Sequence, residues 1–230
     1  AAKRSSVGLW WTAAAIGAPG RFTLGIGPSH QPVVEGMLGL SYATPGRHTE
    51  EYVSVLTTLL SRETVAFDGD EFRVNVGAPT VQGDIDVPVL LAALAPRLLR
   101  VAGERTAGTI LWMANAQAIA SHVAPTIGRH GDHPRIVAGL PVAVTDDVGA
   151  AREVAANVFA IYGELPNYQR ILAHGGISTP AEAAIVGDEG AVTAQIEALF
   201  EAGATDVWAA PFPVGPDRRA SRERTHALLK

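Results

Sequence analysis

The hydrophobic positions along the chain change their spacing in a way that predicts strands alternating with helices. Residues 87–93 form a continuous apolar run, which is typical of a strand buried on both faces. Residues 48–61 instead carry apolar side chains at the 3.6-residue spacing of a helix with one buried face. Alternation of this kind predicts right-handed βαβ units and therefore a parallel sheet.

The predicted elements extend over most of the chain. About five strands of this type are expected, at 22–27, 87–93, 109–113, 135–145 and 206–210. Helices are expected at 48–61, 96–104, 116–128, 148–163, 188–202 and 217–229, after the tail of another helix at 13–19. Gly139 and Pro141 interrupt the strand at 135–145, so a bulge is expected there.

Two further segments do not follow the alternation. Residues 65–67 and 72–76 flank Asp68-Gly69, which predicts an antiparallel hairpin that decorates the domain outside its main sheet. Residues 32–46 are rich in Gly, Pro and aromatic side chains and predict a long connection over the sheet edge. Long ordered connections in compact domains are usually functional.

A polar stretch that contains Gly and Pro leads from residue 164 to Pro180, and it is expected to be a connection. The motif GDEGAV follows at 187–192 and superficially suggests a phosphate-binding loop. No strand is expected before it, however, so Asp188 is interpreted as the cap of the next helix.

Composition favours one globular domain that spans residues 1–230. The chain is 47% hydrophobic and 18% charged, which suits a large core. Its net charge of -5 and the lack of a Lys/Arg run argue against a nucleic-acid surface. No stretch reaches the ~18 uninterrupted apolar residues of a spanning helix, so no membrane partner is expected. With no cysteine, the chain has no disulfide or thiolate site, and a cytoplasmic location fits.

Three histidines lie close together in the sequence, at His122, His130 and His133. They lack the i, i+4 spacing with which a helix binds a metal ion. His130 and His133 belong to a turn with Gly, Asp and Pro and are expected to be solvated. No metal site is predicted.

The strongest candidate site follows the strand at 22–27. Gly25 and Gly27 remove side chains near its end, which suits either a closely approaching ligand or a tight turn. Ser29 and His30 come next, at the carboxyl edge of a parallel sheet, where such sheets bind ligands. The pKa of an imidazole lies near neutrality, so His30 can donate or accept a proton. A lone histidine is more often a structural hydrogen-bonding residue, and both interpretations stay open.

A second candidate is the turn ALAPR at 93–97, which leads into a helix. Its amides and its arginine lie at a helix N-terminus, which attracts anions by geometry and dipole. A solvated arginine in a first helical turn is the common alternative. Met113 ends the next strand and is expected either to line a pocket or to pack in the core.

Four segments carry a resemblance: GRFTLGIGPSHQPVVEGMLGLSY at 20–42, PVLLAALAPRLLRVAGERTAGTILWM at 88–113, RIVAGLPVAVTDD at 135–147 and DVWAAPFPVGPDRRASRER at 206–224. They resemble the luciferase-like monooxygenase family, in particular its branch of oxidoreductases that use the deazaflavin coenzyme F420. The second segment is the best marker of that family. The resemblance spans about residues 13–229.

This resemblance implies a TIM barrel with one insertion after its fourth strand. The hairpin at 65–76 lies where the insertion falls, and the strand at 22–27 becomes the fourth. The first three strands have no counterpart, and residues 1–12 resemble none of them. We therefore expect about five recognisable strands of the eight in a closed barrel. The resemblance therefore implies either a relative that is truncated or frameshifted at its N-terminus or a barrel built from fewer strands.

The resemblance also implies roles for the candidate residues. His30 stands where the family carries a side chain that donates a proton or contacts the cofactor, and the turn at 93–97 stands where the family holds the cofactor's phosphate. The glycines fit a slot for a flat ring. The expected cofactor-binding residues are Gly25, Gly27, Ser29, Ala93, Leu94, Ala95, Arg97 and Met113.

The expected function is that of an oxidoreductase that transfers a hydride between coenzyme F420 and a small organic substrate. An FMN-dependent monooxygenase of the same family is an alternative. A non-catalytic flavin-binding or remnant protein is another alternative, because strands of the barrel are missing. Missing strands also leave the edges of a sheet unpaired. Unpaired edges favour association, so a homodimer is expected.

Overall fold

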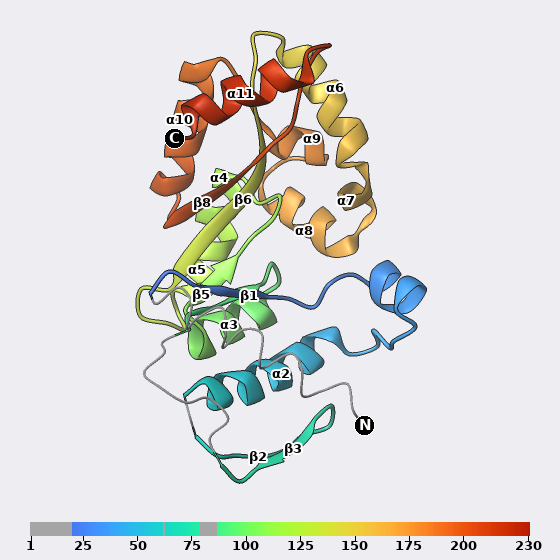
Figure 1. Ribbon diagram of the computed structural model, residues 1–230, viewed down its shortest axis with the longest axis vertical. Helices are drawn as coiled ribbons and strands as arrows, with labels where there is room; N and C mark the ends of the chain where they lie inside the picture. The colour runs from blue at the N-terminus through green and yellow to red at the C-terminus, as the bar shows by residue number, and fades with distance from the viewer. Residues whose placement is uncertain (1–19, 62, 79–86) are drawn as a thin grey trace.

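A computed structural model describes residues 20–61, 63–78 and 87–230 of the chain. The helix tail expected at 13–19 lies outside these residues. In the described part of the chain, parallel strands form a central six-stranded sheet (Figure 1). The strands are β1 (Leu24–Ile26), β4 (Val89–Ala92), β5 (Gly108–Ile110), β6 (Arg135–Val144), β7 (Ile185–Gly187) and β8 (Asp206–Pro211). The predicted α/β architecture with a parallel sheet is confirmed.

Strand β6 is the centre of this sheet because it pairs with three other strands. Val137 pairs with Ile110 of β5 on one edge and with Asp206 of β8 on the other. Val142 pairs with β7 and also with β8. One edge of β6 is therefore shared by β5 and then β7, while β8 occupies the opposite edge. On the other side of β5 the order continues through β4 to β1.

The described strands do not close into a barrel. Among the described residues, β1 pairs only with β4, and β8 pairs only with β6. A closed TIM barrel needs eight strands in a continuous ring. The expectation of an incomplete barrel of the TIM type is confirmed.

Helices connect the strands and cover the sheet (Figure 1). Asp147, Asp188 and Asp217 each cap a helix by accepting a hydrogen bond from a backbone N–H in its first turn. The helices are α2 (Pro45–Leu60), α3 (Pro96–Arg105), α4 (Ala116–Ala118), α5 (Ala124–Ile127), α6 (Val148–Val158), α7 (Ala160–Glu164), α8 (Pro166–His174), α9 (Pro180–Ala183), α10 (Glu189–Glu201) and α11 (Arg218–Leu228), with π-helical turns η1 (Pro32–Met37) and η2 (Ile119–Val123).

The predicted hairpin is present as β2 (Val65–Asp68) and β3 (Arg73–Val76), which form a separate antiparallel sheet. Asp68 pairs with Arg73, so four residues form the connection. The Glu51 carboxylate on α2 accepts hydrogen bonds from three backbone N–H groups of this connection, at 70–72. The hairpin is therefore attached to α2 and not to the main sheet.

The bulge predicted in β6 is absent. Residues 137–142 pair without interruption with 206–211 of β8. Gly139 has another reason to be glycine, because a Cβ there would collide with the Leu111 carbonyl oxygen and with the Trp208 ring. Gly139 therefore interrupts the apolar pattern because the neighbouring strands pack closely against it.

The structure also adds elements that the sequence pattern did not predict. Helix α8 and helix α9 lie within the expected connection at 164–180 and just after it, and η1 lies within the expected connection at 32–46. Strand β7 directly precedes the motif at 187–192, which corrects the expectation that no strand stands there. Asp188 nevertheless caps α10 as predicted, accepting a hydrogen bond from the Ala191 N–H at 2.8 Å.

The main hydrophobic core lies between the sheet and the helices beside it. Leu91, Leu111 and Leu140 contribute fully buried side chains from successive segments of the sheet. Leu99 of α3 and Ile119 of η2 pack against them. This core holds the carboxyl ends of β4 and β5 in place, and the candidate site begins at those ends.

Candidate functional site

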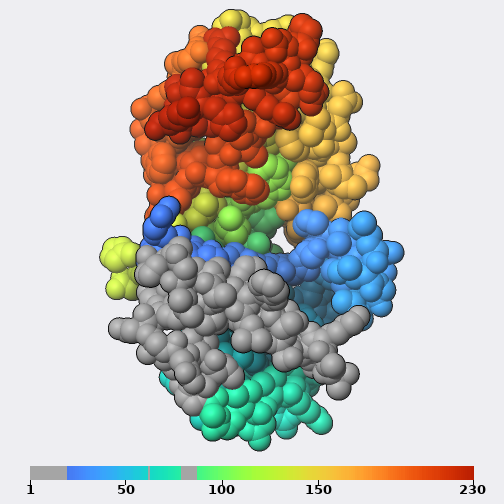
Figure 2. All heavy atoms as spheres, viewed as in Figure 1, coloured from blue at the N-terminus to red at the C-terminus, as the bar shows by residue number. Residues whose placement is uncertain are grey.

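A small hollow of about 230 Å³ lies where β1, β4 and β5 end. The segments that follow these strands form its floor, and α8 and β8 add side walls. Figure 2 shows the surface notched between the blue segment that follows β1 and the orange segment of α7 and α8. Its described lining residues are Gly27, Pro28, Ser29, His30, Ala92, Ala93, Leu94, Ile110, Leu111, Trp112, Asn167, Tyr168 and Trp208. None of these residues is Asp, Glu, Lys or Arg, so the described lining carries no permanent charge.

His30 reaches this hollow because the backbone turns sharply before it. Ser29 adopts a left-handed conformation with a φ of 60°, which is uncommon for a residue with a side chain. The Tyr42 hydroxyl donates a hydrogen bond of 2.8 Å to the Ser29 carbonyl oxygen and holds the turn. Burial lowers the pKa of His30 below its usual value of 6.5, so the imidazole is neutral at pH 7.

Aromatic rings surround His30 and continue along one wall. The His30 ring lies 5.6 Å from the Tyr168 ring and 6.5 Å from the Tyr162 ring, measured between centroids. Tyr162 in turn contacts Trp112, whose ring lies 5.2 Å from that of Trp208. Such a wall offers ring faces and edges to a flat aromatic ligand.

The Trp112 indole carries an unused hydrogen-bond donor. Its Nε1 is buried and has no hydrogen-bond partner among the described residues. Buried N–H groups in native proteins are almost always paired, and an exception calls for an explanation. Trp112 lines the small hollow with its ring, but the Nε1 atom itself is buried and is not exposed to the hollow.

The turn at 93–97 contributes to the hollow through its backbone. Ala93 and Leu94 line the hollow, and Ala95 is the residue before the first turn of α3. Among the described residues, no side chain caps this helix end, so its first N–H groups remain available to an anion.

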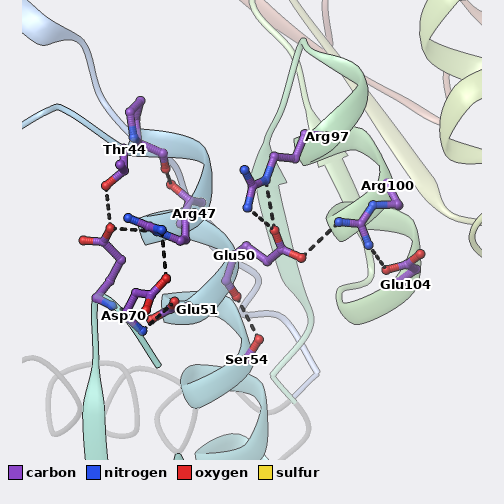
Figure 3. Close-up of polar contacts among 12 residues, drawn as sticks. Thr44, Arg47, Glu50, Glu51, Ser54, Asp70, Arg97, Arg100 and Glu104 are labelled. Atoms are coloured by element: carbon purple, nitrogen blue, oxygen red, sulfur yellow. Dashed lines mark hydrogen bonds and ion pairs between the residues drawn. The ribbon is translucent and has the colours of Figure 1, made fainter. Parts of the chain in front are cut away.

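Arg97 points away from the hollow toward α2. Its guanidinium donates hydrogen bonds of 2.8 and 3.0 Å to the Glu50 carboxylate (Figure 3). Glu50 also pairs with Arg100. Burial alone would raise the pKa of Glu50, but its hydrogen bonds and charge interactions with the two arginines lower that pKa overall. The Arg97 charge is thus partly compensated.

The glycines and Met113 have distinct positions. Gly27 lines the hollow, and a Cβ there would lie 2.7 Å from the Ala92 Cβ, so the approach of β4 already requires a glycine. Gly25 lies in β1, is exposed and does not line the hollow. Met113 is completely buried with a φ of 64° and is not a lining residue. The structure therefore brings His30, Ser29 and Gly27 together with Ala93 and Leu94.

A larger hollow of about 660 Å³ adjoins the small one and shares Gly27 and Pro28 with it. Its apolar lining comes mainly from β1, the η1 segment and α2, and includes Val34, Leu40 and Tyr52. His48 and Glu71 line its polar side, 3.6 Å apart between Nδ1 and Oε2. This volume lies within the range of small-molecule sites, about 300–1,000 Å³.

Sequence reasoning missed the aromatic wall. Tyr168 belongs to α8, and the apolar residues Tyr168, Ile171 and Leu172 after Pro166 do have helical spacing. That signal was present in the sequence, within a stretch interpreted as a connection. Trp112 lies within the strand predicted at 109–113, but nothing in the sequence indicates that its N–H has no acceptor among the described residues.

The remaining histidines do not form a metal-binding group with other side chains in the described part of the chain. The His133 side chain is almost fully exposed, as predicted, whereas His130 is partly buried with its Nδ1 3.4 Å from Glu104. Within the described ranges, no group of three or more metal-binding side chains comes together. No helix in those ranges has both the length and the apolar character needed to cross a bilayer.

Comparisons with known proteins identify relatives of this chain. The profile of the family described as luciferase-like monooxygenase matches residues 14–206. The 5,10-methylenetetrahydromethanopterin reductase of Methanolobus tindarius is 26% identical over 244 residues, which covers 90% of this chain and 74% of the reductase.

Solved structures share the fold. An F420-dependent secondary alcohol dehydrogenase in complex with an F420-acetone adduct has a TM-score of 0.75 at 18% identity, covering 98% of this chain and 74% of that chain. The oxygenating constituent of 3,6-diketocamphane monooxygenase from Pseudomonas putida, in complex with FMN, has a TM-score of 0.57 at 18% identity, covering 91% of this chain and 68% of that chain. Because the family profile covers most of its length, the chain belongs to the luciferase-like monooxygenase family.

Proposed function

We propose that this protein is an oxidoreductase that exchanges a hydride between coenzyme F420 and a small organic substrate. The observation that carries the proposal is the small hollow at the strand ends, with its uncharged described lining and its aromatic wall. These features fit a flat, neutral ring system. Family membership and the F420-dependent dehydrogenase with the same fold support F420 as the ring that binds.

The chain's own residues would hold the cofactor from two sides. Gly27 and Ser29 would border the ring on one side, and Ala93 and Leu94 would border it on the other. The Trp112 ring would form part of the aromatic wall beside the cofactor ring. When bound, a deazaflavin supplies a two-electron hydride carrier.

The phosphate would lie beside the first turn of α3. The available N–H groups of that turn favour an anion, and the helix dipole adds to the attraction. Arg97 lies in the same turn and would add positive charge, while Glu50 holds its guanidinium toward α2. Gly25, Ala95 and Met113 would support the segments that form the slot, since none of them lines it.

His30 would be the catalytic residue. It lines the hollow, and its pKa lies below 6.5, so its neutral ring can accept a proton or donate a hydrogen bond at pH 7. In this role His30 gives or takes the proton that accompanies hydride transfer at the substrate. The larger hollow would receive the substrate, because it meets the small hollow at Gly27 and Pro28.

A cofactor titration of the purified chain tests the proposal. F420 and FMN are added separately, and binding is followed by ring absorbance and by fluorescence quenching. We expect F420 to bind more tightly than FMN, and we expect Trp112→Ala, which removes the ring from the aromatic wall, to weaken that binding. Tighter binding of FMN would contradict the choice of F420.

An FMN-dependent monooxygenase is the second candidate. The observation that favours it is the shared fold with the FMN-bound oxygenating constituent of 3,6-diketocamphane monooxygenase. Oxygen uptake in the presence of reduced FMN and a ketone would support it. A chain that binds either ring but stays silent in reductase and oxygenase assays would instead be a non-catalytic member of the family.

A further inference from the structure

His122 is a buried histidine that the proposed chemistry does not use. It lies in η2, a π-helical turn inside the helical segment that follows β5, and only 9% of its surface is exposed. Single π-helical turns within helices occur frequently at functional sites. The contacts of the His122 side chain indicate a role for the π-helical turn η2.

One edge of the His122 ring holds the turn that borders the small hollow. Its Nε2 lies 2.8 Å from the Leu94 carbonyl oxygen. A carbonyl oxygen only accepts, so the Nε2 must carry the proton and donate. Because the Leu94–Ala95 peptide is planar and trans, fixing the Leu94 carbonyl also fixes the direction of the Ala95 N–H.

The face of the same ring holds the opposite wall. His122 and His174 stack with their centroids 3.9 Å apart and their planes within 3° of parallel. His174 is the last residue of α8, and the first turn of α8 carries Asn167 and Tyr168, which line the hollow.

Two further contacts join the same segments. Ser121 donates a hydrogen bond of 3.3 Å to the His174 carbonyl oxygen, and the Asn115 amide donates one of 3.0 Å to the Gly175 carbonyl oxygen. A side chain at Gly175 would collide with Asn115, so the two segments lie in close contact. His122 takes part in the contact between these two segments and also forms a hydrogen bond with Leu94.

We propose that His122 is a positioning residue for the small hollow, which sets the Leu94 turn by its hydrogen bond and sets α8 by stacking on His174. The inference rests on the proposed function, which places the cofactor between these two walls. His122 itself does not line the hollow, so it acts through its neighbours.

Two substitutions separate the hydrogen bond from the volume of the ring. His122→Gln keeps an N–H donor that can reach a carbonyl, whereas His122→Phe keeps a ring for stacking and loses the donor. His226→Phe, on an exposed position of α11, is the matched control. For each purified chain, the Kd for F420 is measured by fluorescence quenching, and backbone amide shifts are measured by NMR without cofactor.

We expect His122→Phe to raise the Kd for F420 about threefold to tenfold, the range for one lost hydrogen bond. His122→Gln is expected to raise the Kd less than His122→Phe does, since it keeps the donor and loses only the stacking ring. The Ala95 amide shift should move in His122→Phe, and the Asn167 amide shift should move in His174→Ala, whereas neither moves in the control.

Unchanged F420 affinity in His122→Phe would overturn the proposal, and so would equal weakening in His122→Gln. If the unmodified chain binds neither F420 nor FMN, the proposed function fails. The NMR measurement then still decides the inference, because unchanged Ala95 and Asn167 amides in these variants would remove the positioning role without any cofactor.

Discussion

His30 stands among rings and has no charged neighbour in the small hollow. The desolvation that follows from this setting lowers its pKa and keeps the imidazole neutral at pH 7. A neutral imidazole has one nitrogen that donates and one that accepts, so either direction of proton movement is open to it. Whether His30 donates or accepts a proton therefore depends on the pH and on whether the substrate presents a proton acceptor or a proton donor.

The first prediction concerns removal of this group. His30→Ala is expected to lower turnover about 10²- to 10⁴-fold, the usual contribution of one positioned acid or base. The Kd for F420 should change much less, because the cofactor would be held mainly by backbone and by aromatic side chains. Steady-state kinetics and fluorescence titration measure the two quantities.

His133→Ala is the matched control, because the His133 side chain is almost fully exposed and touches neither hollow. Unchanged turnover in His30→Ala would remove the proton role from His30.

The second prediction concerns pH. The pKa of His30 lies below 6.5, so the ring is protonated only at pH values below that point. If His30 donates the proton, kcat/KM for substrate reduction should rise as the pH falls through this pKa. In the reverse direction, kcat/KM should rise as the pH increases through the same pKa. An inflection that persists in His30→Gln would assign the pKa to another group.

At this scale the sequence indicated the positions of the site but not all of its contacts. The placement of His30, Ser29 and Gly27 after a strand was enough to bring them to the hollow. The direction of Arg97 was not predictable, because its partner Glu50 lies 47 residues earlier in the chain, on a different helix. Contacts of that kind depend on how α2 and α3 pack, and single-residue patterns do not contain this information.

The Thr225 side chain connects helix α11 to the end of β6. The Thr225 hydroxyl is buried, accepts a hydrogen bond of 3.0 Å from the Val144 N–H and donates one of 3.1 Å to the Ser221 carbonyl oxygen. Val144 is the last residue of β6, so this contact satisfies the backbone where the strand ends.

The third prediction follows from that contact. Thr225→Val keeps the shape of the side chain but leaves the Val144 N–H buried without an acceptor. The free energy of unfolding should fall by about 1–3 kcal/mol. Thr225→Ser keeps the hydroxyl and should lose less. Urea unfolding measures both variants, and equal midpoints for Thr225→Val and the unmodified chain would contradict the account.

Element prediction succeeded where local signals were strong. Asp68-Gly69 marked the hairpin, and Pro96 and Asp188 marked helix starts that are present. Strand β7 was missed because its three residues, Ile185–Gly187, are too few to show a period. The prediction of a bulge at Gly139 was wrong. A glycine in a strand can mark a bulge, or it can make room for the backbone of a neighbouring strand, and only the packed sheet shows which of the two applies.

At the scale of the molecule, the central sheet is open among the described residues. In the described part of the chain, the outer edge of β1 carries no partner strand, and the segment that follows exposes Met37, Leu38 and Leu40. Unpaired strand edges and exposed apolar side chains favour association. We propose that the protein is a homodimer.

The fourth prediction is therefore a mass in solution of twice 24.0 kDa, measured by light scattering during size-exclusion chromatography. Leu38→Lys and Leu40→Lys together should shift the protein toward the monomer. The matched control is Ile161→Lys, at an exposed apolar position of α7. A mass of 24.0 kDa at every protein concentration would contradict the proposal.

The pairing of β6 on both edges has a kinetic consequence. Its amide protons are enclosed by β5, β7 and β8, so they can exchange with deuterium only when the whole sheet comes apart. Amides of β1, which is short and paired on one edge, should exchange much sooner. If residues 1–230 unfold as one unit, the slowest amides on either side of β6 should share a single opening rate. That rate would report the lifetime of the folded chain.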